Sequence, residues 1–342
     1  MIWCLFVLLF PSLVFAGAAE DDYATRKAGA VYAVDFDTIG SGAAGSFDII
    51  TGGAGRNTGN DGLGVNRISL DTNIKRSGAG SMRIHVPPPP HAGANIGGQW
   101  KMAFSPGFGP GDPFYSQYAV RWSRFMIEDD WPDNNSWKAG IFCYNTCPCA
   151  EMGIVDVNWN HRDIYSGYTN CGDRAFLSKT DNDFSWITHQ ANALYKVNAH
   201  DYNCRFQTWP SDNCFKFKPN VWHHIYKEVL IGTWGGADSL IKVQIWTEGV
   251  PVYKTVVHLT DMTFNCNNPP CDGDPDEYNN VEFGVYMTGL PTTAGLPYDA
   301  YVWYDELIVS SSPIPAPAVK PADSIGQIAR TGGFMSGGGM MR

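Results

Sequence analysis

Alternating apolar and polar side chains run through the second half of the chain in short segments. These segments fall within 221–232, 240–254, 281–293 and 298–313, are rich in Val, Ile, Tyr and Trp, and are bounded by Gly, Pro, Asn or Asp. This pattern is typical of consecutive β-strands that bury one face. The segment Thr247–Val250 indicates a tight turn between two of them. The chain is therefore predicted to be an antiparallel all-β protein.

Three earlier segments fit the same scheme. Residues 31–36 predict a first strand that pairs near the final one, 77–90 an early strand, and 114–131 a long central strand rich in aromatic residues. In this order the segments resemble the concanavalin A-like jelly roll, which occurs in legume-lectin-type domains and in several polysaccharide lyases. The resemblance covers residues 31–312 and implies a two-sheet antiparallel β-sandwich.

Within that fold the chain most resembles the alginate and glucuronan lyases of polysaccharide lyase families 14 and 20. In those proteins a long aromatic strand precedes a strand that contains Gly-Lys, and the last strand carries Phe or Tyr before Asp. The corresponding stretch here is 137–141, WKAGI, with Trp137 in place of the glycine, and the final strand carries Tyr304-Asp305. The resemblance implies a catalytic role for Lys138.

The two ends of the chain differ from the domain between them. Residues 1–16 are uncharged and precede small residues, which predicts a secretory signal peptide cleaved after Ala16. A polar lead-in at 17–30 follows, and 313–342 are expected to form a Pro-rich linker and a flexible tail rich in Gly and Met. We expect a secreted, extracellular monomer with one domain at 31–312 and no membrane-spanning segment.

Cysteine content agrees with export. The chain has nine cysteines, and eight remain when Cys4 is removed with the signal. An even number in a secreted protein predicts disulfide bonds. Cys204 with Cys214 and Cys266 with Cys271 are candidate local pairs, whereas the grouped cysteines at 143, 147, 149 and 171 allow several pairings. A zinc site on that group is the alternative, but its C-x3-C-x-C spacing is unusual for zinc.

The net charge of the chain excludes some classes of binding partner. The net charge of −10 argues against nucleic acid and anionic membranes as partners. A uronic-acid polymer would need a local group of basic residues on this acidic body.

Segments 40–64 and 87–112, rich in Gly, Asn or Pro, are predicted to be loops. The long stretch 169–219 is predicted to be an insertion, either functional or a decoration held by disulfides.

Strand alternation predicts which polar residues turn away from the core. In 117–125, 153–162 and 281–288 the bulky apolar residues suit the core, which leaves a polar set on the opposite face. If these strands are neighbours, one cleft holds the candidate residues Arg121, Lys138, Asp156, Asn158, Arg162, Tyr165 and Tyr286.

This set suits β-elimination on a uronic acid, which needs a group that neutralises the carboxylate, a base, and an acid for the leaving oxygen. Arg121 or Arg162, with Asp156 and Asn158, would bind substrate. Lys138 or Tyr286 would be the base and Tyr165 the acid. No cofactor is required. The predicted function is that of a secreted polysaccharide lyase.

Two other functions remain as alternatives. A non-catalytic, lectin-like carbohydrate-binding protein would stack sugars on aromatic residues, for which the candidates are Trp159, Tyr165, Tyr168, Trp186 and Trp209. A glycoside hydrolase ranks lower, because the Glu-x-Asp-x-x-Glu motif of laminarinase-type jelly rolls does not occur in the sequence.

Metal sites have weak support in the sequence. His223 and His224 lie in a predicted strand, where adjacent residues face opposite sides and cannot bind one ion together. The acidic stretch 272–277, with Asp305, has the oxygen ligands for a structural Ca²⁺, but a solvated acidic turn is the favoured account. We therefore assign no metal ligands.

Overall fold

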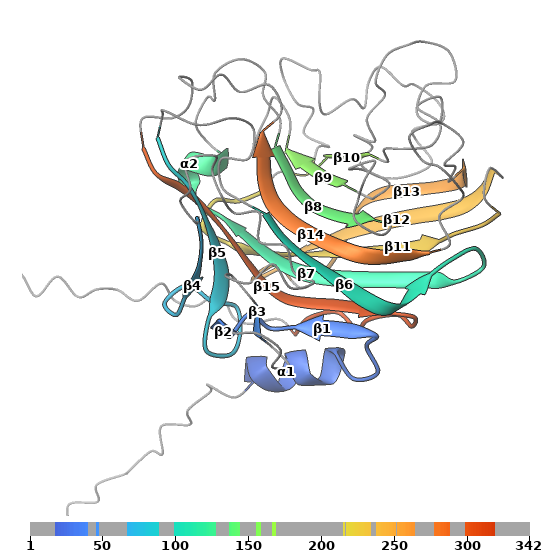
Figure 1. The fold of residues 1–342 in the computed structure, drawn as a ribbon, viewed down its shortest axis with the longest axis horizontal. Helices are drawn as coiled ribbons and strands as arrows, with labels where there is room; N and C mark the ends of the chain where they lie inside the picture. The colour runs from blue at the N-terminus through green and yellow to red at the C-terminus, as the bar shows by residue number, and fades with distance from the viewer. Residues whose placement is uncertain are drawn as a thin grey trace, which may run out of the picture.

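The structure is a computed structural model of residues 1–342. It describes residues 18–39, 46–47, 67–88, 99–127, 137–143, 155–158, 166–168, 215, 217–233, 237–250, 252–263, 277–287 and 298–318. Two antiparallel β-sheets stack face to face in this part of the chain (Figure 1). The prediction of an all-β sandwich is confirmed.

The larger sheet has eight strands in the order β13-β12-β11-β7-β15-β5-β4, and β1 also pairs with β15. β1 and β5 lie along the same edge of β15 at successive positions. The strands are β1 (Tyr32–Val34), β4 (Ile68–Asp71), β5 (Ser81–Val86), β7 (Pro113–Trp122), β11 (Trp222–Leu230), β12 (Ala237–Thr247), β13 (Lys254–Thr263) and β15 (Ala300–Ser310).

The smaller sheet has five strands in the order β10-β9-β8-β14-β6. These strands are β6 (Gln99–Phe108), β8 (Trp137–Cys143), β9 (Val155–Asn158), β10 (Ser166–Tyr168) and β14 (Tyr278–Met287). A separate short pair consists of β2 (Thr38–Ile39) and β3 (Ser46–Phe47), and the helices are α1 (Ala18–Arg26) and α2 (Arg124–Ile127). No helix among the described residues is long and apolar enough to cross a membrane.

Most sequence-predicted strands are confirmed. The first strand pairs with the last, as expected. The turn after β12 closes with a hydrogen bond from Val250 N to Thr247 O, and Gly249 takes the positive φ that glycine adopts at low cost. The predicted loop at 87–112 is wrong in its second half, because 99–108 form β6. Pro106 lies in this strand at an edge of the sheet, where the missing N–H costs no ladder hydrogen bond.

Aromatic and branched side chains fill the space between the two sheets. Phe283 of β14 stacks on Tyr304 of β15 at a ring separation of 4.5 Å, and Tyr118 of β7 packs against the same phenylalanine at 4.8 Å. Trp100 of β6 also stacks on Phe283, with ring centroids 5.7 Å apart. Burial of such large rings stabilises the sandwich by roughly 25 cal/mol for each Å² of apolar surface removed from water.

The outer face of the larger sheet is covered by the two ends of the described chain. Helix α1 packs Tyr23 against Tyr226 and Ile308, and Ile314 joins the same cluster from the segment that follows β15. Figure 1 shows α1 beside β1 at the margin of the larger sheet. Residues 18–26, expected as a polar lead-in, thus form a packed helix. In the segment 313–318, expected as the start of a linker, Ile314 and Pro317 are buried.

A β-bulge in β15 explains the two acidic residues that interrupt this strand. The register between β15 and β7 shifts between Asp305 and Ile308, and Glu306 has a positive φ of 52°. A bulge lets two consecutive residues point to one side of a sheet. Tyr304 and Leu307 therefore both face the core, while Asp305 and Glu306 both lie in the polar network on the outer face.

Candidate functional site

The alternation along β14 indicates which of its residues lie on the outer face of the smaller sheet. Val281, Phe283 and Val285 are buried in the core. Because successive residues of a strand point to opposite faces, Glu282 lies on the outer face. The register against β8 shifts between Phe283 and Tyr286, and the outer-face position of Tyr286 follows from its neighbour Val285, which is buried in the core.

Lys138 joins this face through its strand pairing. β8 pairs with β14, and Lys138 is the cross-strand partner of Tyr286. Directly paired residues of antiparallel strands occupy positions on the same face. The structure therefore brings two of the three predicted catalytic residues to neighbouring positions on the outer face of the smaller sheet.

A lysine that the sequence analysis did not select lies farther along the same face. Lys101 of β6 pairs with Glu282 across the strands, and its Nζ lies 2.5 Å from Glu282 Oε2. The carboxylate side chain is only 4% exposed, whereas the lysine side chain is 25% exposed. We call the positions Lys101, Lys138, Glu282 and Tyr286 the polar face.

Lys101 was missed because its segment was predicted to be a loop. The Pro and Gly residues of 87–112 outweighed a short alternation in which Trp100 and Phe104 are buried in the core and Met102 packs against it. That alternation is the sequence signal that could have revealed both the strand and the outward position of Lys101.

The register of β9 differs from the one expected. Val157 pairs with Lys138, whereas Asp156 pairs with Gly140 and Asn158 with Trp137. Because neighbours in a strand alternate, Asp156 and Asn158 occupy the face opposite to the one that Lys138 shares with Val157. The cause is an irregularity in β8 between Lys138 and Gly140, which shifts the pairing by one residue. The structure does not bring these two residues into the polar face.

Arg121 lies in the other sheet. It belongs to β7, pairs with Trp222 and Trp303, and sits on the outer face of the larger sheet. Burial lowers its pKa, while the carboxylates of Glu248 and Asp71 raise it. The expected cleft with Lys138 is therefore not formed, because β7 and β8 follow one another along the chain but belong to different sheets.

The remaining sequence candidates fall largely outside the described residues. Arg162 and Tyr165 lie there, as do Trp159, Trp186 and Trp209, the acidic positions 272–276 and every cysteine except Cys143. Tyr168 lies in β10, paired with Val155. The roles predicted for Arg162 and Tyr165 stay predictions.

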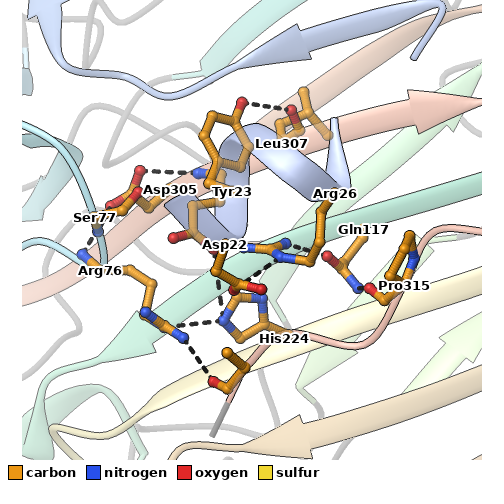
Figure 2. A network of polar contacts seen from close by, with 12 residues as sticks. Asp22, Tyr23, Arg26, Arg76, Ser77, Gln117, His224, Asp305, Leu307 and Pro315 are labelled. Atoms are coloured by element: carbon orange, nitrogen blue, oxygen red, sulfur yellow. Dashed lines mark hydrogen bonds and ion pairs between the residues drawn. The ribbon is translucent and has the colours of Figure 1, made fainter. Parts of the chain in front are cut away.

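A second polar group lies on the outer face of the larger sheet, beneath α1 and the segment after β15 (Figure 2). Arg26 donates hydrogen bonds to Gln117 and Glu306, and its Nε lies 3.1 Å from Asp22 Oδ2. Gln117 in turn donates from Nε2 to the Pro315 carbonyl at 3.2 Å. These contacts tie the helix, the central strands and the final segment together.

The other half of the network surrounds His224. Arg76 donates from Nε to His224 Nε2 at 3.2 Å and from Nη2 to the Ala318 carbonyl at 3.3 Å. Asp305 accepts the backbone N–H groups of Arg76 and Ser77 at 2.8 and 3.3 Å. Burial raises the pKa of Asp305 well above its usual range, and the nearby Glu306 carboxylate raises it further.

This buried network is unsuited to a polysaccharide. Arg26, Arg76, Gln117, His224 and Glu306 are all buried, so a polymer in solvent has no access to them. The carboxylate of Asp305 already accepts backbone hydrogen bonds, including one from Glu306 N. Among the described residues no group of three or more His, Cys, Asp or Glu could hold a metal ion. We assign this network a structural role.

The adjacent histidines behave as the alternation predicted. His223 faces the core, where its ring meets Phe217 edge-on at 5.1 Å, whereas His224 lies on the outer face against Trp246. Burial lowers the pKa of His223 to about 3, so its ring stays neutral near pH 7. Its Nε2 accepts the Lys218 N–H at 3.2 Å. Their opposite orientation rules out a shared metal ion.

Comparison with known proteins identifies the fold. The chain matches no protein-family profile and no curated protein. Among solved structures it is similar to a marine PL-14 alginate lyase from Aplysia kurodai, with a TM-score of 0.50 and 16% identity over 82% of this chain and 98% of that one. At this identity the similarity establishes a common fold.

Two further structures resemble the chain more distantly. An endo-β-1,4-glucuronan lyase from the fungus Trichoderma reesei gives a TM-score of 0.48 and 13% identity, covering 83% of this chain and 96% of that one. The alginate lyase Aly36B gives a TM-score of 0.43 and 14% identity, covering 83% and 98%. The resemblance to alginate lyases noted in the sequence is confirmed at the level of fold by the Aplysia structure.

Proposed function

We propose that this chain, with the fold of the Aplysia alginate lyase, is a secreted enzyme that cleaves a uronic-acid-containing polysaccharide by β-elimination on its polar face. One observation carries the proposal: Lys138 and Tyr286 are cross-strand partners on the outer face of the smaller sheet. A proton acceptor and a second polar group at neighbouring positions are what the reaction needs.

The chemistry requires little beyond correct placement. The base, Lys138 or Tyr286, removes the proton on the carbon next to the uronate carboxylate. The electron pair left behind forms a carbon–carbon double bond, and the bond from the neighbouring ring carbon to the glycosidic oxygen breaks. An acid gives that oxygen a proton. The products are a new reducing end and an unsaturated sugar, and no cofactor or water is consumed.

A cation near the substrate carboxylate would stabilise the negative charge that develops when the proton leaves. Arg121 is placed in the other sheet, so this role passes to Arg162, and Tyr165 remains the proposed acid. Neither Arg162 nor Tyr165 belongs to the described part of the chain.

A hydrolytic mechanism fits the described residues less well. Glycosidases position two carboxyl groups roughly 5 to 9 Å apart around the sugar. On the polar face, within the described residues, Glu282 is the carboxylate that the register places outward, and it forms an ion pair with Lys101. Asp156 occupies the opposite face of β9. The described residues therefore supply no such pair there.

The proposal is tested by the ultraviolet absorbance of the unsaturated product. The purified protein is incubated with alginate, glucuronan, pectate and glycosaminoglycans, each in parallel with Lys138→Ala. The matched control is Lys242→Ala, a lysine on the outer face of the larger sheet whose side chain is 31% exposed. We expect absorbance to rise with the parent and the control and to be lost in Lys138→Ala. A flat trace with the parent protein on every polymer contradicts lyase activity.

A non-catalytic carbohydrate-binding protein is the second candidate. It is favoured by one observation, the stacked pair of Phe125 and Tyr298, whose rings lie 4.6 Å apart and whose residues are 37% and 46% exposed. Exposed aromatic rings can stack on sugars. A flat absorbance trace together with retention of a polymer in affinity electrophoresis would support this function.

A further inference from the structure

We infer that Lys101 and Glu282 form a second substrate-binding subsite, which recognises the hydroxyl groups of a sugar rather than a carboxylate. This inference rests on the proposed function, because it assumes that the polysaccharide lies along the polar face. It assigns a ligand chemistry to a pair that has no part in the elimination step itself.

The first argument is position. Glu282 lies four residues before Tyr286 on β14, and Lys101 lies one strand beyond Glu282, on the side away from β8. With a rise of about 3.4 Å per residue and strands about 4.8 Å apart, the positions of Lys101 and Lys138 are roughly 17 Å apart. That separation exceeds one sugar ring. A polymer whose reacting sugar lies at Lys138 would therefore reach Lys101 with a different sugar of the same chain.

The second argument is charge. The Lys101 ammonium has three N–H donors, and its contact with Glu282 leaves donors for a ligand. The Glu282 carboxylate lies beside it but is only 4% exposed, so it balances the charge of Lys101, and the contacts with a ligand come from the ammonium. The pair as a whole is neutral, and a substrate carboxylate approaching Lys101 would also meet the negative charge of Glu282. A donor whose charge is already balanced suits sugar hydroxyls, whose oxygens accept hydrogen bonds.

The third argument is orientation. Glu282 is almost fully buried between β6 and β8, so its carboxylate is fixed by the sheet and holds the more exposed Lys101 ammonium in one place. A fixed polar pair loses little conformational freedom when a ligand binds. The subsite is thus suited to distinguish uronic acids, or neutral sugars between them, by the configuration of their hydroxyls.

The test uses the full chain and compares Lys101→Met with the control Lys242→Met. Substrates are alginate or glucuronan oligosaccharides of increasing length. Loss of hydrogen bonds from a charged donor, worth about 1.5 kcal/mol or more, predicts a KM for long oligosaccharides raised about tenfold. We expect kcat to change less than twofold, and KM for disaccharide- and trisaccharide-sized substrates to stay near the parent value because they cannot span both sites.

Ionic strength separates hydroxyl recognition from carboxylate recognition. If Lys101 bound a carboxylate, removing it would weaken the salt dependence of KM. We expect the salt dependence of Lys101→Met to match that of the parent. Glu282→Gln supplies the converse test: it leaves Lys101 as an isolated cation, so KM should gain salt dependence and fall at low salt. An unchanged KM in Lys101→Met for all lengths, or a weaker salt dependence, overturns the inference.

Binding measurements keep this result separate from the proposed function. Affinity electrophoresis in gels containing alginate or glucuronan needs no catalysis and can be run in the Lys138→Ala background. Weaker retention after Lys101→Met, with no absorbance signal from the parent protein on any polymer, would support the subsite and contradict the lyase. Normal retention after Lys101→Met, with full lyase activity in the parent, would overturn the subsite alone. Circular dichroism of each variant checks that it is folded.

Discussion

Removing the charge of Glu306 should destabilise the protein far more than removing the charge of an exposed residue. The side chains of Glu306 and Arg26 are both 0% exposed, and their contact joins β15 to α1. Glu306→Gln keeps the shape but leaves the guanidinium buried with less compensation. Breaking a buried ion pair from one side costs about 3 to 5 kcal/mol. Asp22 still pairs with Arg26, so we expect a loss of about 3 kcal/mol, the low end of that range.

The assay is equilibrium unfolding in urea, followed by tryptophan fluorescence. Provided that the slope with denaturant is unchanged, the shift in midpoint gives the change in the free energy of unfolding. The control is Glu228→Gln, whose ion pair with Lys242 spans 3.7 Å between side chains that are about one-third exposed. Such exposed pairs contribute about 0.5 kcal/mol.

Two outcomes decide whether the reasoning holds. A loss below about 1 kcal/mol in Glu306→Gln would refute it, since that is what a surface pair contributes. The double variant Arg26→Met with Glu306→Leu removes both charges and should recover much of the loss, because an apolar pair of similar volume has no buried charge to desolvate. If the double variant is as unstable as the single one, the loss of stability comes from disturbed packing and not from an unpaired buried charge.

Two further predictions concern burial at His223 and at Ile314. The pKa of His223 is lowered to about 3 in the folded state, so between about pH 6.5 and pH 3 the unfolded chain binds a proton that the folded protein does not. Stability should therefore fall with decreasing pH in this window. His223→Gln should reduce the slope by up to about 1.4 kcal/mol per pH unit, as measured by urea unfolding at several pH values. Equal slopes in the parent and His223→Gln would contradict this account. Ile314→Ala should lower the free energy of unfolding by about 2 kcal/mol, because the side chain packs in one cluster with Tyr23 and Tyr226. A loss below about 0.5 kcal/mol in the same urea assay would contradict the packing of the segment after β15 on the larger sheet.

Strand identity was predictable where alternation was strong, and strand arrangement was not. β11, β12 and β15 carry branched and aromatic residues with clear alternation, so their existence followed from the sequence. Whether β7 and β8 lie in one sheet does not follow from alternation, because a pattern of period two records only which face is buried. That is why Arg121 was grouped with Lys138 although the two belong to different sheets.

The candidate site was predictable in part, for related reasons. Lys138 and Tyr286 were selected from a resemblance and from alternation, and their pairing required knowledge of the register. The faces of Asp156 and Asn158 depend on an irregularity in β8 that no residue pattern announces. Helix α1 was missed because it is short, and short helices owe their stability to tertiary contacts such as those of Tyr23 and Arg26.

The position of α1 and of residues 313–318 decides which face of the protein stays accessible when it is immobilised or labelled. Both lie over the outer face of the larger sheet, while the polar face belongs to the smaller sheet on the other side of the sandwich. A tether, dye or solid support joined directly after residue 318 would therefore be attached on the side of the larger sheet. Immobilised in that way, the protein would present Lys101 and Lys138 to the surrounding liquid, whereas attachment through β6 or β10 would turn them toward the support.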